Sequence, residues 1–260
     1  MFTFKRLALA SALLMVGAAN ALPTLQLGIL GATYDTSTET GVATVSSFKL
    51  YAFLQAGDPT ALLTDTYYVS AALTPMLATA STGLGSYKFE GATKNVTADM
   101  TYGTPPLDAV YGALYGDLQT HSIFPTYFNE FAFNFTALNR ATSVNTQDNA
   151  SLGGVSFNTN GVGDLYWAEF DVDVSALSSA YAMHFDLYNT DVRNCSRRED
   201  CAQVVSREDF APFSHDAQSL NGGGGGPGGN PNPAPEPATL ALVGLALAAM
   251  GAAKRRGRKV

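Results

Sequence analysis

The chain has 260 residues, among them 15 Phe and 12 Tyr, which suffices for one folded domain with a core of its own. The segment from Leu22 to Pro237 contains all 22 acidic residues but only eight of the 15 basic residues, so its formal charge is −14. An acidic surface repels phosphate backbones, which argues against nucleic-acid binding. It suits a soluble extracellular protein and attracts divalent cations.

The first 21 residues contain the three parts of a signal peptide in the usual order. Lys5 and Arg6 are the positive region, Leu7–Ala18 is the apolar region, and Ala19-Asn20-Ala21 is an A-x-A cleavage site. The apolar region is too short to span a bilayer comfortably. We predict cleavage after Ala21; the alternatives are an N-terminal membrane anchor and a buried first helix.

Apolar and polar side chains alternate along several segments of the next 200 residues, which is typical of strands that bury one face. The predicted strands are Phe48–Leu54, Phe131–Thr136, Tyr166–Val174, Tyr181–Tyr188, Tyr67–Leu73, Tyr87–Glu90 and Ser151–Phe157. Pro106–Tyr115 is predicted to be a short helix, because proline suits a first helical turn. Many short strands with polar turns predict an all-β fold, namely a single β-sandwich of jelly-roll type over residues 22–220.

Cys195 and Cys201 are the two cysteines of the chain. Exported proteins meet oxidising conditions, so we predict a disulfide that closes a small polar surface loop. Such a bridge stabilises the fold by about 2 kcal/mol in the chain-entropy model. Two cysteines are too few for a structural zinc site.

The last 40 residues have the composition of a tether followed by a membrane segment. Residues 221–234 are rich in glycine and then proline, which predicts a linker that is flexible at first and then extended. Pro235-Glu236-Pro237 comes next, followed by an uncharged apolar run over 238–253 and a basic tail over 254–260. The 16 apolar residues predict a transmembrane helix about 24 Å long, somewhat short for a hydrocarbon core of about 30 Å. The basic tail favours the cytoplasmic side.

Residues 235–260 resemble the bacterial PEP-CTERM sorting signal in their motif, apolar helix and basic end. The resemblance implies that exosortase, a membrane protease, acts near Pro235, Glu236 and Pro237. The protein would then pass transiently through the inner membrane of a Gram-negative bacterium to the cell surface or extracellular matrix. The alternative is a plain C-terminal membrane anchor.

The exported part is similar to the PEP-CTERM proteins of the choice-of-anchor N family. The segments that carry this similarity are 25–27, 31–35, 99–106, 121–128 and 210–217. The family implies an exported domain with a variable anchor. It implies no established activity, so no catalytic residue is assigned.

Signatures of hydrolases, zinc proteases and phosphate-binding loops are not found, and a pair of acidic residues for glycoside hydrolysis stays open. His121, His184 and His215, with Asp186 and Asp216, are weak candidates for a metal site if their segments converge. His184 and Asp186 lie two apart on one strand and so share a face; the simpler interpretation places them on its wetter face.

Two further features of the predicted strand Tyr166–Val174 suggest ligands. Asp171 and Asp173 share a face, with Asp164 near the strand's start, so either solvent or a calcium ion would relieve their repulsion. Trp167 is on the same face as Glu169 and Asp171, which suits a sugar-binding face, although packing between sheets explains the aromatic residues equally well.

These observations favour a non-enzymatic exported β-sandwich protein of the surface, matrix or biofilm, with polysaccharide as the candidate ligand and no required cofactor. The alternative is a secreted carbohydrate-active enzyme of β-sandwich type. A structural or adhesive protein without a ligand is the third hypothesis.

Overall fold

The computed structural model describes residues 24–56, 63–105, 123–189, 193–194, 202–203, 211 and 215–220. The predicted signal peptide, the helix at 106–115, both cysteines, the linker and the sorting tail lie outside these residues. Most of the described chain is β-sheet, which confirms the all-β prediction. Among the described residues, no helix is long and apolar enough to cross a membrane.

Sheet A has seven strands, and the long neighbouring strands β4 and β12 lie in the middle of it. Its path runs from β1 (Leu25–Ile29) through β4 (Ser47–Gln55) and β12 (Leu165–Asp173) to β10 (Arg140–Ala141) and β11 (Phe157–Asn158). β6 (Ser86–Phe89) pairs with the far end of β12 and with β7 (Ala92–Asn95). β12 and β4 pair in antiparallel register over nine positions, from Leu165 opposite Gln55 to Asp173 opposite Ser47.

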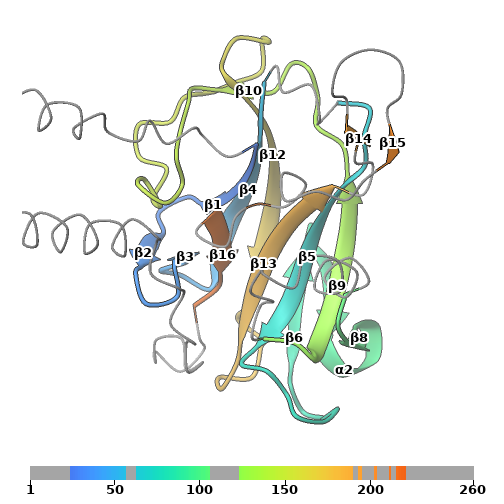
Figure 1. Cartoon of the computed structure of the whole chain (residues 1–260). Helices are drawn as coiled ribbons and strands as arrows, with labels where there is room; N and C mark the ends of the chain where they lie inside the picture. The colour runs from blue at the N-terminus through green and yellow to red at the C-terminus, as the bar shows by residue number, and fades with distance from the viewer. Residues whose placement is uncertain are drawn as a thin grey trace, which may run out of the picture.

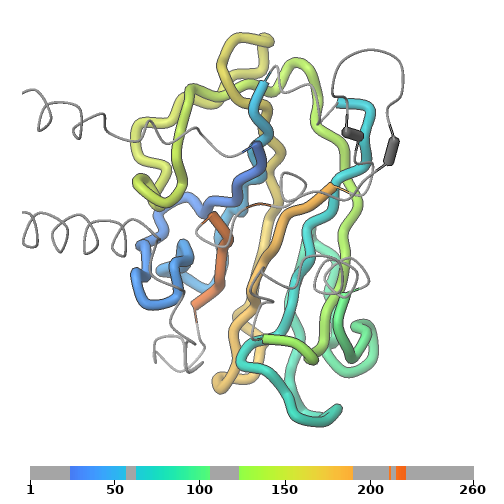
Figure 2. The backbone as a smooth tube through the Cα atoms, in the orientation of Figure 1, coloured from blue at the N-terminus to red at the C-terminus, as the bar shows by residue number. Residues whose placement is uncertain are grey.

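Sheet B also has seven strands, and three long ones lie side by side at its centre (Figure 1). The order is β2 (Thr33–Asp35), β3 (Thr40–Val42), β16 (Asp216–Gln218), β13 (Ala182–Asn189), β5 (Tyr67–Thr74), β9 (Thr126–Phe133) and β8 (Thr101–Gly103). β16 pairs in parallel with β3, so segments from opposite ends of the described chain are neighbours (Figure 2). A separate ribbon joins β14 (Arg193–Asn194) to β15 (Ala202–Gln203).

Helix α2 (Val96–Asp99) is a single turn between β7 and β8. The Asn95 side chain begins it by accepting hydrogen bonds from the backbone N–H groups of Thr97 and Ala98, each at 3.1 Å. Asparagine is favoured at this capping position because its oxygen satisfies amides that have no partner within the helix.

The two sheets share one hydrophobic core, to which each contributes the apolar face of its strands. Leu27 and Leu50 of sheet A and Val69 and Phe185 of sheet B are at most 1% exposed within this cluster. Aromatic pairs join the sheets, with ring centroids 3.9 Å apart for Phe89–Phe131, 5.0 Å for Phe133–Phe170 and 6.1 Å for Phe48–Phe185. Two layers around a common core are the arrangement that the alternating pattern predicted.

A second apolar cluster covers part of the outer face of sheet A. Tyr51 and Phe53 of β4 point away from the shared core and pack with Leu152 and Leu165. The loop between β10 and β11 covers them, and Gln26 of β1 holds this loop. Gln26 Nε2 donates to the Val144 carbonyl at 3.1 Å, and its Oε1 accepts from the Thr146 N–H at 3.0 Å.

Several predicted strands are confirmed, but two expectations are wrong. Ser151–Phe157 is mostly a turn, because the Asn149 side chain accepts from the Gly153 N–H and Leu152 adopts a positive φ of 57°. The second face of β13 is not wet, since all eight of its residues are buried.

Candidate functional site

A groove of about 570 Å³ lies on the outer side of sheet A, beyond the part that the loop covers. Lys49, Lys88 and Asp171 line it, and Asp173 pairs across the strands with Lys88. Leu30 and Val45 are at its rim and are about half exposed, at 49% and 54%. The groove therefore combines apolar side chains with charges of both signs.

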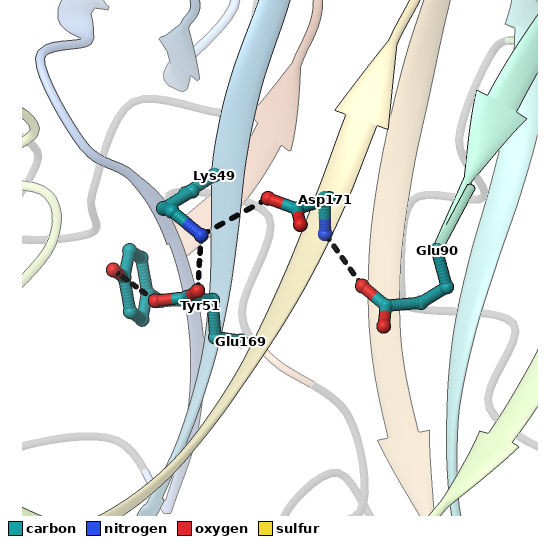
Figure 3. A network of polar contacts seen from close by, with 5 residues as sticks. All are labelled: Lys49, Tyr51, Glu90, Glu169 and Asp171. Carbon is teal, nitrogen blue, oxygen red and sulfur yellow. Dashed lines mark hydrogen bonds and ion pairs between the residues drawn. The ribbon is translucent and has the colours of Figure 1, made fainter.

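A polar network borders this groove, and its members come from β4, β12 and the turn after β6 (Figure 3). Lys49 Nζ donates to Glu169 and, at 3.0 Å, to Asp171 Oδ1. Tyr51 Oη donates to Glu169 Oε2 at 2.5 Å. Glu90 Oε1 accepts from the Asp171 backbone N–H at 2.6 Å. Strand pairing explains this convergence, because Lys49 is opposite Asp171 and Tyr51 is opposite Glu169 in the β4–β12 ladder.

The network fixes the protonation of its two proton donors. The hydrogen bonds to Glu169 and then Asp171 raise the pKa of Lys49, so its ammonium group stays charged. Burial, followed by the hydrogen bond to Glu169, raises the pKa of Tyr51, so its hydroxyl stays neutral and donates. The two carboxylates are thus tied by fixed donors at one edge of the groove.

The acidic residues proposed for calcium have lysines beside them. Lys49 contacts Asp171, and Lys88 Nζ lies 3.8 Å from Asp173 Oδ2. Hydrogen bonds from Ser175 are the main cause of a lowered pKa at Asp173. Lysine side chains therefore supply positive charge to this strand face, in the place where the sequence suggested a cation.

Trp167, the proposed centre of a sugar-binding face, belongs to the second apolar cluster. Its ring packs edge-on against Phe157 with centroids 5.5 Å apart, and its Nε1–H group donates to the carbonyls of Arg140 and Asn158 at 3.1 and 3.2 Å. A ring packed in this way has a structural role. Packing within the protein, which was the alternative to a sugar-binding face, therefore explains the position of Trp167.

The weak metal candidates separate into three groups. His184, Asp186 and Asp216 are buried together, with one ligand atom from each within 4.8 Å of the others. His215 is elsewhere, with Nε2 2.8 Å from Asn145 Oδ1, and burial lowers its pKa to about 4. His121 lies outside the described residues.

Sequence reasoning did not identify Lys49 and Tyr51 as site residues. The alternation in Phe48–Leu54 had placed both on one face, and that in Tyr166–Val174 had placed Glu169 and Asp171 on one face. The missing information was the pairing of these two strands, which are more than 100 positions apart.

Residues 233–256 match the PEP-CTERM protein-sorting motif. The motif indicates exosortase-dependent export and sorting to the surface of a Gram-negative bacterium. No curated protein and no solved structure matches the chain. The similarity of the exported part to the choice-of-anchor N family remains a prediction.

Proposed function

We propose that the chain is a non-enzymatic protein of the cell surface or extracellular matrix, of the choice-of-anchor N type, that is processed by exosortase. The match of residues 233–256 to the sorting motif carries this proposal. In this scheme residues 1–21 direct export, and the helix at 238–253 holds the protein in the inner membrane until processing near Pro235, Glu236 and Pro237. The domain over 22–220 is a jelly-roll-like sandwich that is displayed or released.

The groove on sheet A supports extracellular polysaccharide, as found in biofilms, as the ligand of this domain. Sugar rings have an apolar face and a rim of hydroxyl groups. Leu30 and Val45 offer exposed apolar contacts, and Lys88 and Asp171 offer a donor and an acceptor within the same groove. Exposed apolar side chains next to charged ones suit a ligand with both kinds of surface.

The network argues for binding rather than hydrolysis. A glycosidase needs two carboxyl groups that flank the bond, one of them as a proton donor. Glu169 and Asp171 instead share the ammonium group of Lys49, and Tyr51 donates a further hydrogen bond to Glu169. Both carboxyl groups therefore already accept hydrogen bonds within the network, and neither is placed as a separate proton donor across an open gap from the other. The secreted carbohydrate-active enzyme is therefore the second candidate.

The sorting step is tested by replacing the acidic residue of the motif. With Glu236→Gln, we expect unprocessed protein to accumulate in the membrane fraction of the native host, because the protease loses its recognition residue. Pro231→Ala, in the adjoining linker, is the matched control and should be processed normally. Normal processing and release of Glu236→Gln would contradict the proposal.

The ligand is tested with glycan arrays and a parallel screen for sugar release. Val45→Asp should abolish glycan binding by placing a charge at the groove. Leu138→Asp is the control, since Leu138 is 62% exposed and is not among the groove residues. Sugar release by the purified protein would favour the enzyme instead, and silence in both assays would favour a structural protein without a ligand.

A further inference from the structure

The outer side of sheet B contains a group of buried residues whose side chains are typical metal ligands. His184 and Asp186 alternate along β13, and Asp216 begins β16. His184 Nε2 lies 3.1 Å from Asp186 Oδ1 and 3.9 Å from Asp216 Oδ2. The side chains of the three residues are at most 7% exposed.

Strand pairing holds these donors in fixed relative positions. In the antiparallel ladder, His184 is opposite Gln218 and Phe185 is opposite Ala217, which brings Asp216 beside Asp186. All three residues are on regular strands, and sites built on strands are held more rigidly than sites on loops. The pairing of β13 with β16 therefore brings the three side chains together.

The spacing fits a small divalent ion. Ligand atoms about 2.1 Å from one ion lie about 3.0–4.2 Å from one another. The 3.1 Å separation of His184 Nε2 from Asp186 Oδ1, which is also a hydrogen-bond distance, and its 3.9 Å separation from Asp216 Oδ2 both fall in this range.

A neighbouring hydroxyl provides an independent indication of a ligand. Ser70 on β5 is directly opposite Asp186 in the β5–β13 ladder, so both side chains leave the same face of the sheet. Ser70 is fully buried, and within the described part of the chain its Oγ has no hydrogen-bond partner. Buried hydroxyls are normally satisfied, and water or another ligand on a metal ion would satisfy this one.

We propose that His184, Asp186 and Asp216 bind one divalent transition-metal ion, with Zn²⁺ as the preferred ion and a non-protein ligand facing Ser70. The imidazole nitrogen favours zinc over calcium, which takes oxygen ligands. His215 has no part in this site. The site is separate from the groove on sheet A and is independent of the sorting function.

The test uses the full chain, purified without a histidine tag and stripped with a chelator. Titration with Zn²⁺ should show one ion per chain. His184→Asn, Asp186→Asn and Asp216→Asn should each weaken binding by more than about 100-fold. His215→Asn and Asp171→Asn are the matched controls and should bind like the unchanged protein. Equal Zn²⁺ affinity in Asp186→Asn and its control would overturn the proposal.

A second measurement needs no variant and covers the case in which the variants do not fold. Zn²⁺ at 100 times its dissociation constant should raise the melting temperature of the unchanged protein by about 5–10 °C. Co²⁺ in place of Zn²⁺ should give visible absorption bands typical of nitrogen and oxygen ligands. The absence of both a melting shift and Co²⁺ absorption bands at millimolar metal would refute the site.

Discussion

The network beside the groove predicts a measurable loss of stability when Lys49 is replaced. Lys49→Met keeps most of the aliphatic stem, which covers apolar surface, and removes the ammonium group. The side chains of Lys49 and Glu169 are 42% and 31% exposed, whereas that of Asp171 is 70% exposed. The pair with Glu169 is therefore the stronger of the two.

The magnitude follows from this exposure. Partly exposed ion pairs contribute about 0.2–1 kcal/mol each, and solvent screening places the pair with Asp171 at the low end. Without Lys49, Glu169 and Asp171 repel each other on one strand face, which adds to the loss. We expect Lys49→Met to lower the free energy of unfolding by about 1–2 kcal/mol and the melting temperature by about 2–8 °C.

Urea unfolding of a double-mutant cycle measures the interaction directly. Lys49→Met and Glu169→Gln should show a coupling energy of about 0.5–1 kcal/mol, and 1 M salt should reduce it only in part, because the pair is half-buried. Lys94→Met on β7 is the control, as Lys94 forms no ion pair with any described residue. No coupling, together with equal stabilities of the two lysine variants, would refute the reasoning.

Four further outcomes are expected. Gln26→Ala should lower the free energy of unfolding in urea by about 2–4 kcal/mol, because it leaves two buried backbone groups of the covering loop unsatisfied; a loss below 0.5 kcal/mol would contradict this. Gly85→Ala should lower the melting temperature sharply and cost at least about 2 kcal/mol, since φ is +86° and a Cβ would lie 2.5 Å from the Ala176 carbonyl oxygen. His215 binds its proton near pH 6.5 when unfolded but only near pH 4 when folded, so stability should fall by about 1–3 kcal/mol as the pH drops through this window; His215→Gln should lose that part of the pH profile. Cys195 and Cys201 should resist alkylation until reduced, because the strand pair Asn194–Ala202 brings their chain neighbours together; labelling without reductant would exclude the disulfide.

Local periodicity predicted the strands well, because each long strand has one face in the shared core. Phe48, Leu50 and Leu54 of β4 are buried there, as the alternation required. The opposite face of β4 could not be interpreted in the same way. Tyr51 and Phe53 are covered by the loop between β10 and β11, about 90 residues further along the chain. No pattern within β4 predicts that this loop packs there.

The candidate sites show the same division between local and long-range information. The two-residue spacing of His184 and Asp186 predicted a shared face, and the structure has both on one side of β13. The arrival of Asp216 depends on β16, which follows β13 in the chain and pairs with it in antiparallel register, and no pattern within β13 indicates that pairing. His215, one position before Asp216 and just outside β16, contacts Asn145 instead, so neighbours in the sequence take part in different contacts.

The position of β16 has a consequence for the order of events during export. This strand fills the place between β3 and β13, so in the proposed export scheme the β2–β3 pair stays separate from the rest of sheet B until residues 216–218 have been exported. The sorting motif begins 15 positions after Gln218, at residue 233. In the proposed scheme, closure of the sheet and capture of the tail by the membrane are nearly simultaneous, and a protein stalled before this point would present an open edge to proteases and chaperones.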